Sequence, residues 1–171
     1  LGEAIAENKE GEEHAEPQRE CLIDVQIDAH IPESYITSLP HRLAIYRRIA
    51  DVRTSEDAMD VTDELIDRFG DPPPSVLGLI EVSLLRNTAA RLGIYEIGQR
   101  GDNLLLYWND INMRAVTRLS HDMKGQILVS AGSKPYVSVK VLKQSETIQT
   151  LKRALLILAA GMREQTSPAQ T

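Results

Sequence analysis

The stretch Asp63-Glu-Leu-Ile-Asp-Arg-Phe-Gly-Asp-Pro-Pro-Pro74 ends one predicted helix, makes a turn and begins the next. Gly70 is the natural end of the first helix, because a left-handed backbone costs glycine almost nothing. The three prolines cannot continue that helix, but they suit the first turn of a new one. Upstream, Thr54 and Asp57 have the spacing of a capping box, so the first helix should begin near residue 55.

The helix predicted over residues 55–69 should have two chemically different sides. Helical periodicity turns one apolar set toward the core: Ala58, Val61, Thr62, Leu65, Ile66 and Phe69. It turns an acidic set the other way: Asp57, Asp60, Glu64 and Asp67. We therefore expect Leu65 and Phe69 in the core, and Glu64 and Asp67 facing water or a partner. The acidic side is either a solvated helix face or an acidic band for a basic partner.

Apolar patterns predict the remaining elements. Residues 22–28 alternate with a period of two and predict a half-buried strand. Hairpins are expected at 94–108 and 126–142, the second with Val137, Val139 and Val141 on its buried face. Further helices are expected at 39–52, 74–92, 110–122 and 145–160, the last ended by Gly161. The apolar side of helix 39–52 should be Leu39, Leu43, Tyr46, Ile49 and Ala50, and helix 74–92 should pack through Val76, Leu77, Ile80, Leu84 and Leu85.

The order of these elements predicts the fold class. Hairpins pair antiparallel, so the simplest packing is a sheet covered by helices. We predict an α+β fold, with a largely antiparallel or mixed sheet of about five strands packed with about five helices.

Composition fits one domain with tails, because the chain has 171 residues. Residues 1–20 carry seven Glu against two basic residues and predict an acidic flexible linker or tail. Residues 21–162 should form the folded domain, and residues 163–171 a frayed tail. The core should be mostly aliphatic, since hydrophobic residues make up 42% of the chain and aromatic residues only 4%. The chain begins with Leu1 rather than Met, so we expect a fragment or a processed product whose function lies partly in sequence outside it.

Net charge argues against direct nucleic-acid binding. Outside residues 1–20 the chain has 17 basic and 18 acidic residues, whereas duplex-binding domains usually carry a basic excess. One alternative stays open: a nucleic-acid-binding accessory module that uses a local arginine face made of Arg42, Arg47, Arg48 and Arg53. The other interpretation of these arginines is a solvated helix face paired with acids.

The sequence contains no clear catalytic or metal-binding motif. Cys21 is the only cysteine, which excludes an intrachain disulfide and any zinc site with several thiolates. Glu20 beside it should raise the pKa of its thiol and leave it inert. The four histidines (14, 30, 41 and 121) lack metal-binding spacings, and no phosphate-cradling loop is present. We predict no catalytic residue, metal or cofactor; an unrecognised small enzyme would need a deep pocket with convergent polar groups.

Membrane and export signals are also missing from the sequence. No apolar run is long enough to span a bilayer, and no secretory signal is visible. We therefore expect a cytoplasmic protein without a membrane partner.

Three strings in a fixed order carry a family resemblance. They are Ile31-Pro-x-x-Tyr35-Ile, Arg42-Leu-x-x-Tyr46-x-Arg-Ile-Ala50, and Glu64-Leu-Ile-Asp-Arg-Phe-Gly70 followed by prolines. In this order and spacing, and with Leu85-Arg86 and Leu92-Gly-Ile94 downstream, the sequence resembles the C-terminal domain of bacterial transcription-repair coupling factor over about residues 20–162. The triple proline departs from a plainer turn in that family.

The resemblance implies a regulatory role. Proteins of this family are ATP-dependent DNA translocases that release stalled RNA polymerase and recruit excision repair through UvrA. Their C-terminal domain is non-catalytic and masks the UvrA-binding surface of an N-terminal module similar to UvrB. The resemblance assigns this contact to Glu64 and Asp67, and we add Asp60 from the same acidic band. The UvrB-like module would be the direct partner, and UvrA and RNA polymerase indirect ones.

Overall fold

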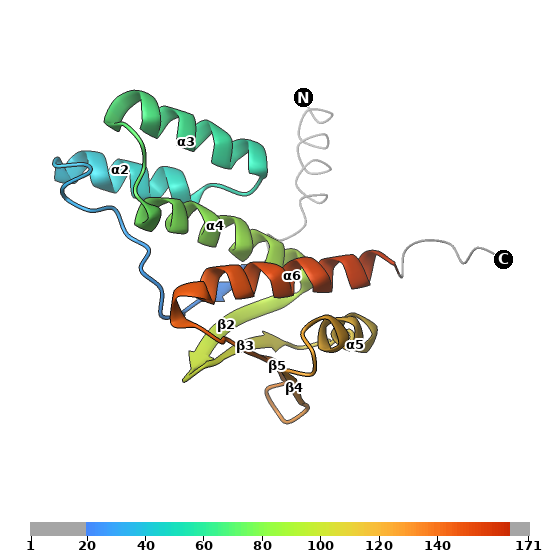
Figure 1. The fold of residues 1–171 in the computed structure, drawn as a ribbon. Coiled ribbons are helices and arrows are strands. Elements are labelled where there is room, and N and C mark those ends of the chain that lie inside the picture. The colour runs from blue at the N-terminus through green and yellow to red at the C-terminus, as the bar shows by residue number, and fades with distance from the viewer. Residues whose placement is uncertain (1–19, 165–171) are drawn as a thin grey trace, which may run out of the picture.

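The computed structural model describes residues 20–164, which fold into helices packed on a five-stranded sheet (Figure 1). The strands are β1 (Leu22–Ile23), β2 (Ile94–Arg100), β3 (Asn103–Trp108), β4 (Ile127–Ser130) and β5 (Tyr136–Lys140). The helices are α2 (Leu39–Ala50), α3 (Ser55–Phe69), α4 (Pro74–Leu92), α5 (Met113–Asp122) and α6 (Thr147–Arg163), with a short 3₁₀ turn η1 (Gln144–Glu146). The expected tail residues 1–19 and 165–171 lie outside the described part, so the predicted tails stay predictions.

The sheet has the strand order β1-β2-β3-β5-β4. β1 pairs parallel with β2 and the other neighbours pair antiparallel, which confirms the predicted α+β class with a mixed sheet. The strand predicted over 22–28 is wrong in length, because pairing stops after Asp24 donates its N–H to Ile97 O at 2.9 Å. The next outward N–H, that of Gln26, bonds instead to the side-chain oxygen of Gln99 at 2.8 Å, so the segment leaves the sheet.

Two hydrophobic clusters hold the chain together, and α4 takes part in both. Val76 and Ile80, in its first half, pack with α2 and α3, whereas Leu85 and Ala89, in its second half, pack with the sheet, α5 and α6. Trp108, 2% exposed, belongs to the larger cluster. Figure 1 shows the result: α2 and α3 lie on one side of α4, and the sheet with α5 and α6 on the other.

The turn between α3 and α4 forms as its residues predict. The Thr54 side chain accepts from Asp57 N, the Asp57 carboxylate accepts from Thr54 N, and α3 begins at the next residue. Gly70 ends α3 with φ of +85°, a value that favours glycine. The Tyr35 hydroxyl donates to Gly70 O at 2.7 Å, and its ring packs edge-on against Phe69. Residues from far upstream therefore fix the turn.

Several expected helix faces are wrong. In α2 the buried side chains are Ile45 and Ile49, whereas Leu39, Leu43 and Tyr46 are exposed. α2 carries apolar residues on more than one side, and packing against α3 and α4 selects only one of them. Ile66 of α3 and Leu77 of α4 are also exposed, because the apolar arc of each helix is wider than the surface it contacts.

Gly161 does not end the last helix. It lies buried inside α6, where a Cβ would come within 2.9 Å of Ala115 Cα on α5. Glycine at this position lets the two helices approach closely, so its function is packing rather than termination. α6 continues to Arg163, one residue into the predicted frayed tail.

Candidate partner-binding surface

The outer face of α3 presents three exposed carboxylates. Val61 and Leu65 are almost completely buried, which fixes the rotation of the helix on the lobe below. Asp60, Asp63 and Asp67 therefore point away from the core, and all three are exposed. None of them is in an ion pair with another residue of the range 20–164. We call these three side chains the acidic face.

Glu64 differs from the acidic face. It is 33% exposed rather than fully turned to water, and its carboxylate lies between two arginines. Arg48 of α2 donates its Nε to Glu64 Oε2 at 3.2 Å, and Arg68 Nη1 lies 3.6 Å from Oε1. The sequence placed Glu64 with the freely exposed acids, but the α2–α3 packing engages it within the domain. Asp60 and Asp67 lie as the sequence predicted.

Two apolar side chains flank the acidic face. Met59 is 65% exposed and Ile66 is 43% exposed, and both stand on the outward half of α3. Protein interfaces commonly combine a few apolar contacts with a polar rim, so this surface has the composition of a small binding site. Sequence reasoning missed Met59 and Asp63, although their helical phase, opposite Val61 and Leu65, identifies them.

The arginine residues of the alternative site do not form one open face. Arg42 donates to the carbonyl oxygens of Ile36 and Thr37 at 2.8 and 3.0 Å, and Arg48 is engaged by Glu64. Arg53 binds through its backbone, which donates to Asp57 and accepts from Asn87. Arg42, Arg48 and Arg53 therefore each make contacts within the lobe, and Arg47 is an exposed residue of α2.

The pKa values of Cys21 and Asp57 are shifted by burial and by backbone hydrogen bonds within the fold. Burial raises the pKa of the Cys21 thiol to about 12, and nearby Glu96 adds to this effect while Arg86 opposes it. The predicted direction is confirmed, but burial rather than Glu20 causes it. Backbone hydrogen bonds from Arg53 and Thr54 lower the pKa of Asp57.

Residues 20–164 offer neither a metal-binding cluster nor a membrane-spanning helix. This range contains no group of three or more His, Cys, Asp or Glu side chains that could hold a metal ion. Among its helices, none is both long and apolar enough to cross a membrane.

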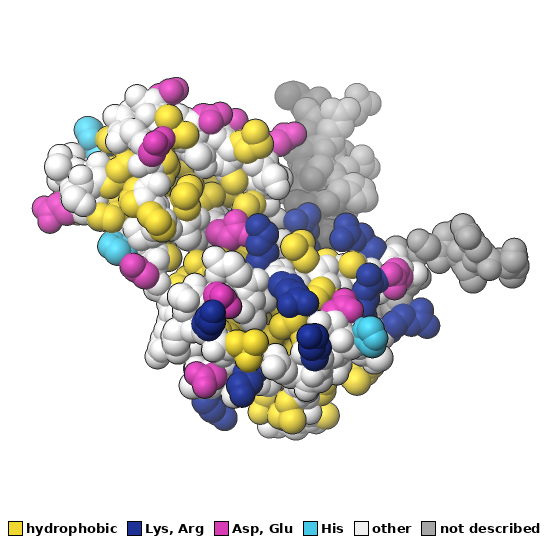
Figure 2. Space-filling view, in the orientation of Figure 1, with side chains coloured by type: hydrophobic (Ala, Val, Ile, Leu, Met, Phe, Trp, Pro, Cys, Tyr) yellow, Lys and Arg dark blue, Asp and Glu magenta, His cyan; other side chains and the backbone are white. Residues whose placement is uncertain are grey.

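Charge is unevenly distributed over the surface. Residues 20–93 carry thirteen acidic and seven basic residues, a net charge of −6 with histidine neutral. Figure 2 shows acidic side chains at the end formed by α2 and α3, and Lys and Arg gathered over the half that contains α5 and α6. The acidic face thus lies in a lobe that is negative as a whole.

Comparison with known proteins places the chain. Residues 25–119 match the model of the TRCF domain family. The transcription-repair-coupling factor of Staphylococcus aureus (strain USA300) is 25% identical over 172 residues, which cover 95% of this chain and 14% of the relative. That of Staphylococcus epidermidis (strain RP62A) is 26% identical over 157 residues, 89% of this chain and 13% of the relative.

A solved structure has the same fold. The crystal structure described as the C-terminal domain of transcription-repair coupling factor superposes with a TM-score of 0.71 at 19% identity, covering 87% of this chain and 98% of that one. The chain spans about one seventh of the length of its curated relatives. Sequence and fold agree on one assignment: the chain belongs to the TRCF domain family and corresponds to the C-terminal domain of transcription-repair coupling factor.

Proposed function

We propose that this domain is a non-catalytic regulatory element that holds a longer transcription-repair coupling factor in an inhibited state. The acidic face of α3 would bind a basic surface on the N-terminal UvrB-like module of the same protein and so cover the site for UvrA. The observation that carries this proposal is the set of three exposed carboxylates, Asp60, Asp63 and Asp67, without a cationic partner in residues 20–164. ATP-driven translocation and the release of RNA polymerase would belong to other parts of the longer protein.

The energetics suit a contact that must open. An exposed ion pair contributes only about 0.2–1 kcal/mol, so a few carboxylates cannot bind a separate partner tightly. A partner on the same chain, however, has an effective concentration on the order of millimolar. A separate-chain Kd of roughly 10 μM would then keep the contact closed about 100 to 1, a bias of about 2.7 kcal/mol. Engagement of RNA polymerase elsewhere could overcome a bias of this size.

Glu64 would have a different role from the acidic face. Its carboxylate already accepts from Arg48 and is paired with Arg68, which follows Asp67 in α3. By neutralising the two arginines, Glu64 would preserve the negative potential that Asp60 and Asp67 present. We therefore propose Asp60 and Asp67 as direct contacts and Glu64 as the residue that positions the neighbouring arginines. The resemblance alone had made Glu64 a direct contact.

The test is binding in trans between this chain and the isolated N-terminal module of a family member, measured by calorimetry. The variant D60K/D67K should weaken binding about tenfold or more, because two attractions become repulsions. The control E33K/D110K changes two exposed acids outside α3 by the same charge and should bind within about twofold of the unmodified chain. Equal binding by both variants would remove the acidic face from the interface.

A further inference from the structure

The end of the domain opposite α3 carries the opposite charge. Residues 111–164 contain nine Lys and Arg against three Asp and Glu, a net charge of +6 with histidine neutral. The near-zero total of the folded part thus hides two lobes of opposite sign. Figure 2 shows the basic side chains gathered over this half of the molecule.

A groove of about 480 Å³ lies within the basic half, where α5 ends, β5 ends and α6 begins. Lys124, Lys140 and Arg153 line it, and Lys143 follows Leu142 of its wall. All four cations are exposed. Two carboxylates, Asp122 and Glu146, also line the groove, and Asp122 is paired with the exposed His121. We call the four cations the basic groove.

The cations of the groove are available for a ligand. None of the four forms an ion pair with a carboxylate of the described range 20–164. Lys134 and Lys152, by contrast, are paired with Glu96 and Glu81, each at 2.9 Å. Three of the unpaired cations of the basic half therefore line one hollow and Lys143 lies next to it, whereas the exposed Arg114 lies outside it.

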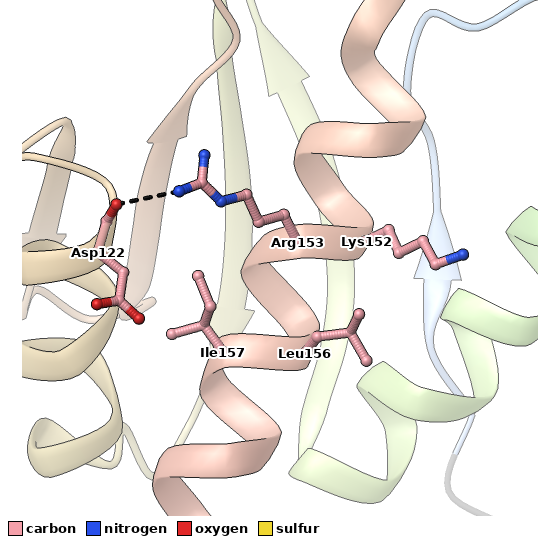
Figure 3. A pocket seen from close by; sticks show the side chains of 5 residues that line it. All are labelled: Asp122, Lys152, Arg153, Leu156 and Ile157. Atoms are coloured by element: carbon pink, nitrogen blue, oxygen red, sulfur yellow. Dashed lines mark hydrogen bonds between the residues drawn. The ribbon is translucent and has the colours of Figure 1, made fainter.

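Arg153 is held in place by the fold. Its Nη2 donates to the backbone oxygen of Asp122 at 3.2 Å, at the end of α5 where carbonyl groups lack helical partners. Figure 3 shows the side chain reaching from α6 toward α5 across a hollow of about 470 Å³, while Lys152 points to the other side of α6. The guanidinium keeps other donors for a second acceptor, because it has five N–H groups.

We propose that the basic groove binds the phosphate backbone of duplex nucleic acid without sequence preference. Exposed, unpaired Lys and Arg side chains displace the counterions of a phosphate backbone, and this electrostatic gain supplies nearly all of non-specific binding. The groove offers cations but no aromatic platform for unstacked bases, so a duplex fits it better than a single strand. This surface is separate from the acidic face and independent of the regulatory proposal.

The test is fluorescence anisotropy of the 171-residue chain with a labelled 20-base-pair DNA duplex. Four phosphate contacts give a slope of about −3.6 in the logarithm of the binding constant against the logarithm of salt concentration. Affinity should therefore fall about 150-fold between 25 and 100 mM salt. The variant K124Q/K140Q should bind about tenfold more weakly or worse, with a slope reduced by about 1.8.

A matched control separates the groove from general charge. The variant R47Q/R91Q removes the same charge from exposed positions on α2 and α4, and it should bind like the unmodified chain. Every variant should have the same unfolding temperature by circular dichroism, so that a loss of binding cannot be due to a loss of fold. No anisotropy change at 25 mM salt, or equal losses in both variants, would overturn the proposal. Stronger binding of a polyglutamate peptide than of the duplex, or duplex binding only after residues 1–19 are removed, would overturn it as well.

Discussion

The substitution Asp67→Asn should change stability and binding in opposite directions. Asp67 lies in the last turn of α3, where the unpaired carbonyl groups make a negative charge unfavourable by about 0.3–1 kcal/mol. It also lies four residues after Asp63, and a like-charge pair at that spacing lowers helix stability by a further amount of about 0.2–0.5 kcal/mol. Asparagine has nearly the same shape and helix propensity. Removing the charge should therefore raise the free energy of unfolding by about 0.5–1.5 kcal/mol.

Thermal unfolding and binding in trans can be measured on the same preparation. The stability gain corresponds to about 1–5 °C in the midpoint for a domain of this size. Loss of one exposed ion pair should raise the Kd for the N-terminal module about 1.5- to 5-fold. Both effects should shrink in high salt, because the charges involved are exposed.

Asp60→Asn is the matched control. Asp60 belongs to the same acidic face but lies in the interior of α3, beyond the turns where the helix dipole acts. It should weaken binding, and its gain in stability should come only from relief of the like charges of Glu56 and Glu64 at i,i+4 spacing, without the helix-dipole part of the Asp67→Asn gain. If Asp67→Asn destabilises the domain, Asp67 has a partner within the fold. If it leaves binding unchanged, Asp67 is outside the interface, and either result refutes the reasoning.

Two further predictions concern the fold. Gly161→Ala should lower the free energy of unfolding by about 1 kcal/mol in urea titrations. Crowding of the Ala115 backbone costs about 1–3 kcal/mol, whereas the better helix propensity of alanine returns only about 1 kcal/mol. A stabilised variant would show that α5 and α6 can move apart without cost. Asp57→Asn should destabilise the domain at neutral pH but not in acid. The pKa of Asp57 is lowered on folding from an ordinary 3.8, so its stabilisation is present above pH 4 and is lost as the pH falls through the lowered value. A difference between the two proteins that does not begin to narrow as the pH falls below 4 would contradict this.

Local signals predicted both ends of α3 and the start of α4 well, but not the end of α6 or the start of α5. Thr54, Gly70 and Pro74 act through their own backbone conformation or through partners within a few residues, so the sequence contains all of the information. The faces of the helices were harder to predict. Whether Leu43 or Ile45 is buried depends on how α2 sits against α3 and α4, and nothing local decides between the two sides of a helix that is apolar on both.

In the candidate sites, too, local features could be predicted from the sequence and features that depend on tertiary packing could not. Exposure of Asp60 and Asp67 followed from helical phase, because Val61 and Leu65 leave α3 one way to pack. The pairing of Glu64 with Arg48 crosses sixteen positions and needs the angle between two helices. Total charge is a weaker guide to partners: a sum near zero argued against a polyanion partner, although a sum contains no information about how the charges are segregated. Charge counted separately along the two folded halves shows the segregation, whereas the groove itself depends on how α5, β5 and α6 meet.

A single helix, α4, joins the acidic face and the basic groove. α4 is an uninterrupted helix of 19 residues whose first half packs with the acidic lobe and whose second half packs with the basic one. Rotating one lobe against the other would break a hydrophobic cluster or the helix itself, at a cost well above the bias of about 2.7 kcal/mol that the proposed contact supplies. Opening should therefore move the domain as a unit, so that release of the acidic face also reorients the basic groove. Under our two proposals, a duplex that is bound better in the released orientation would favour opening, because a ligand shifts an equilibrium only through its different affinities for the two states.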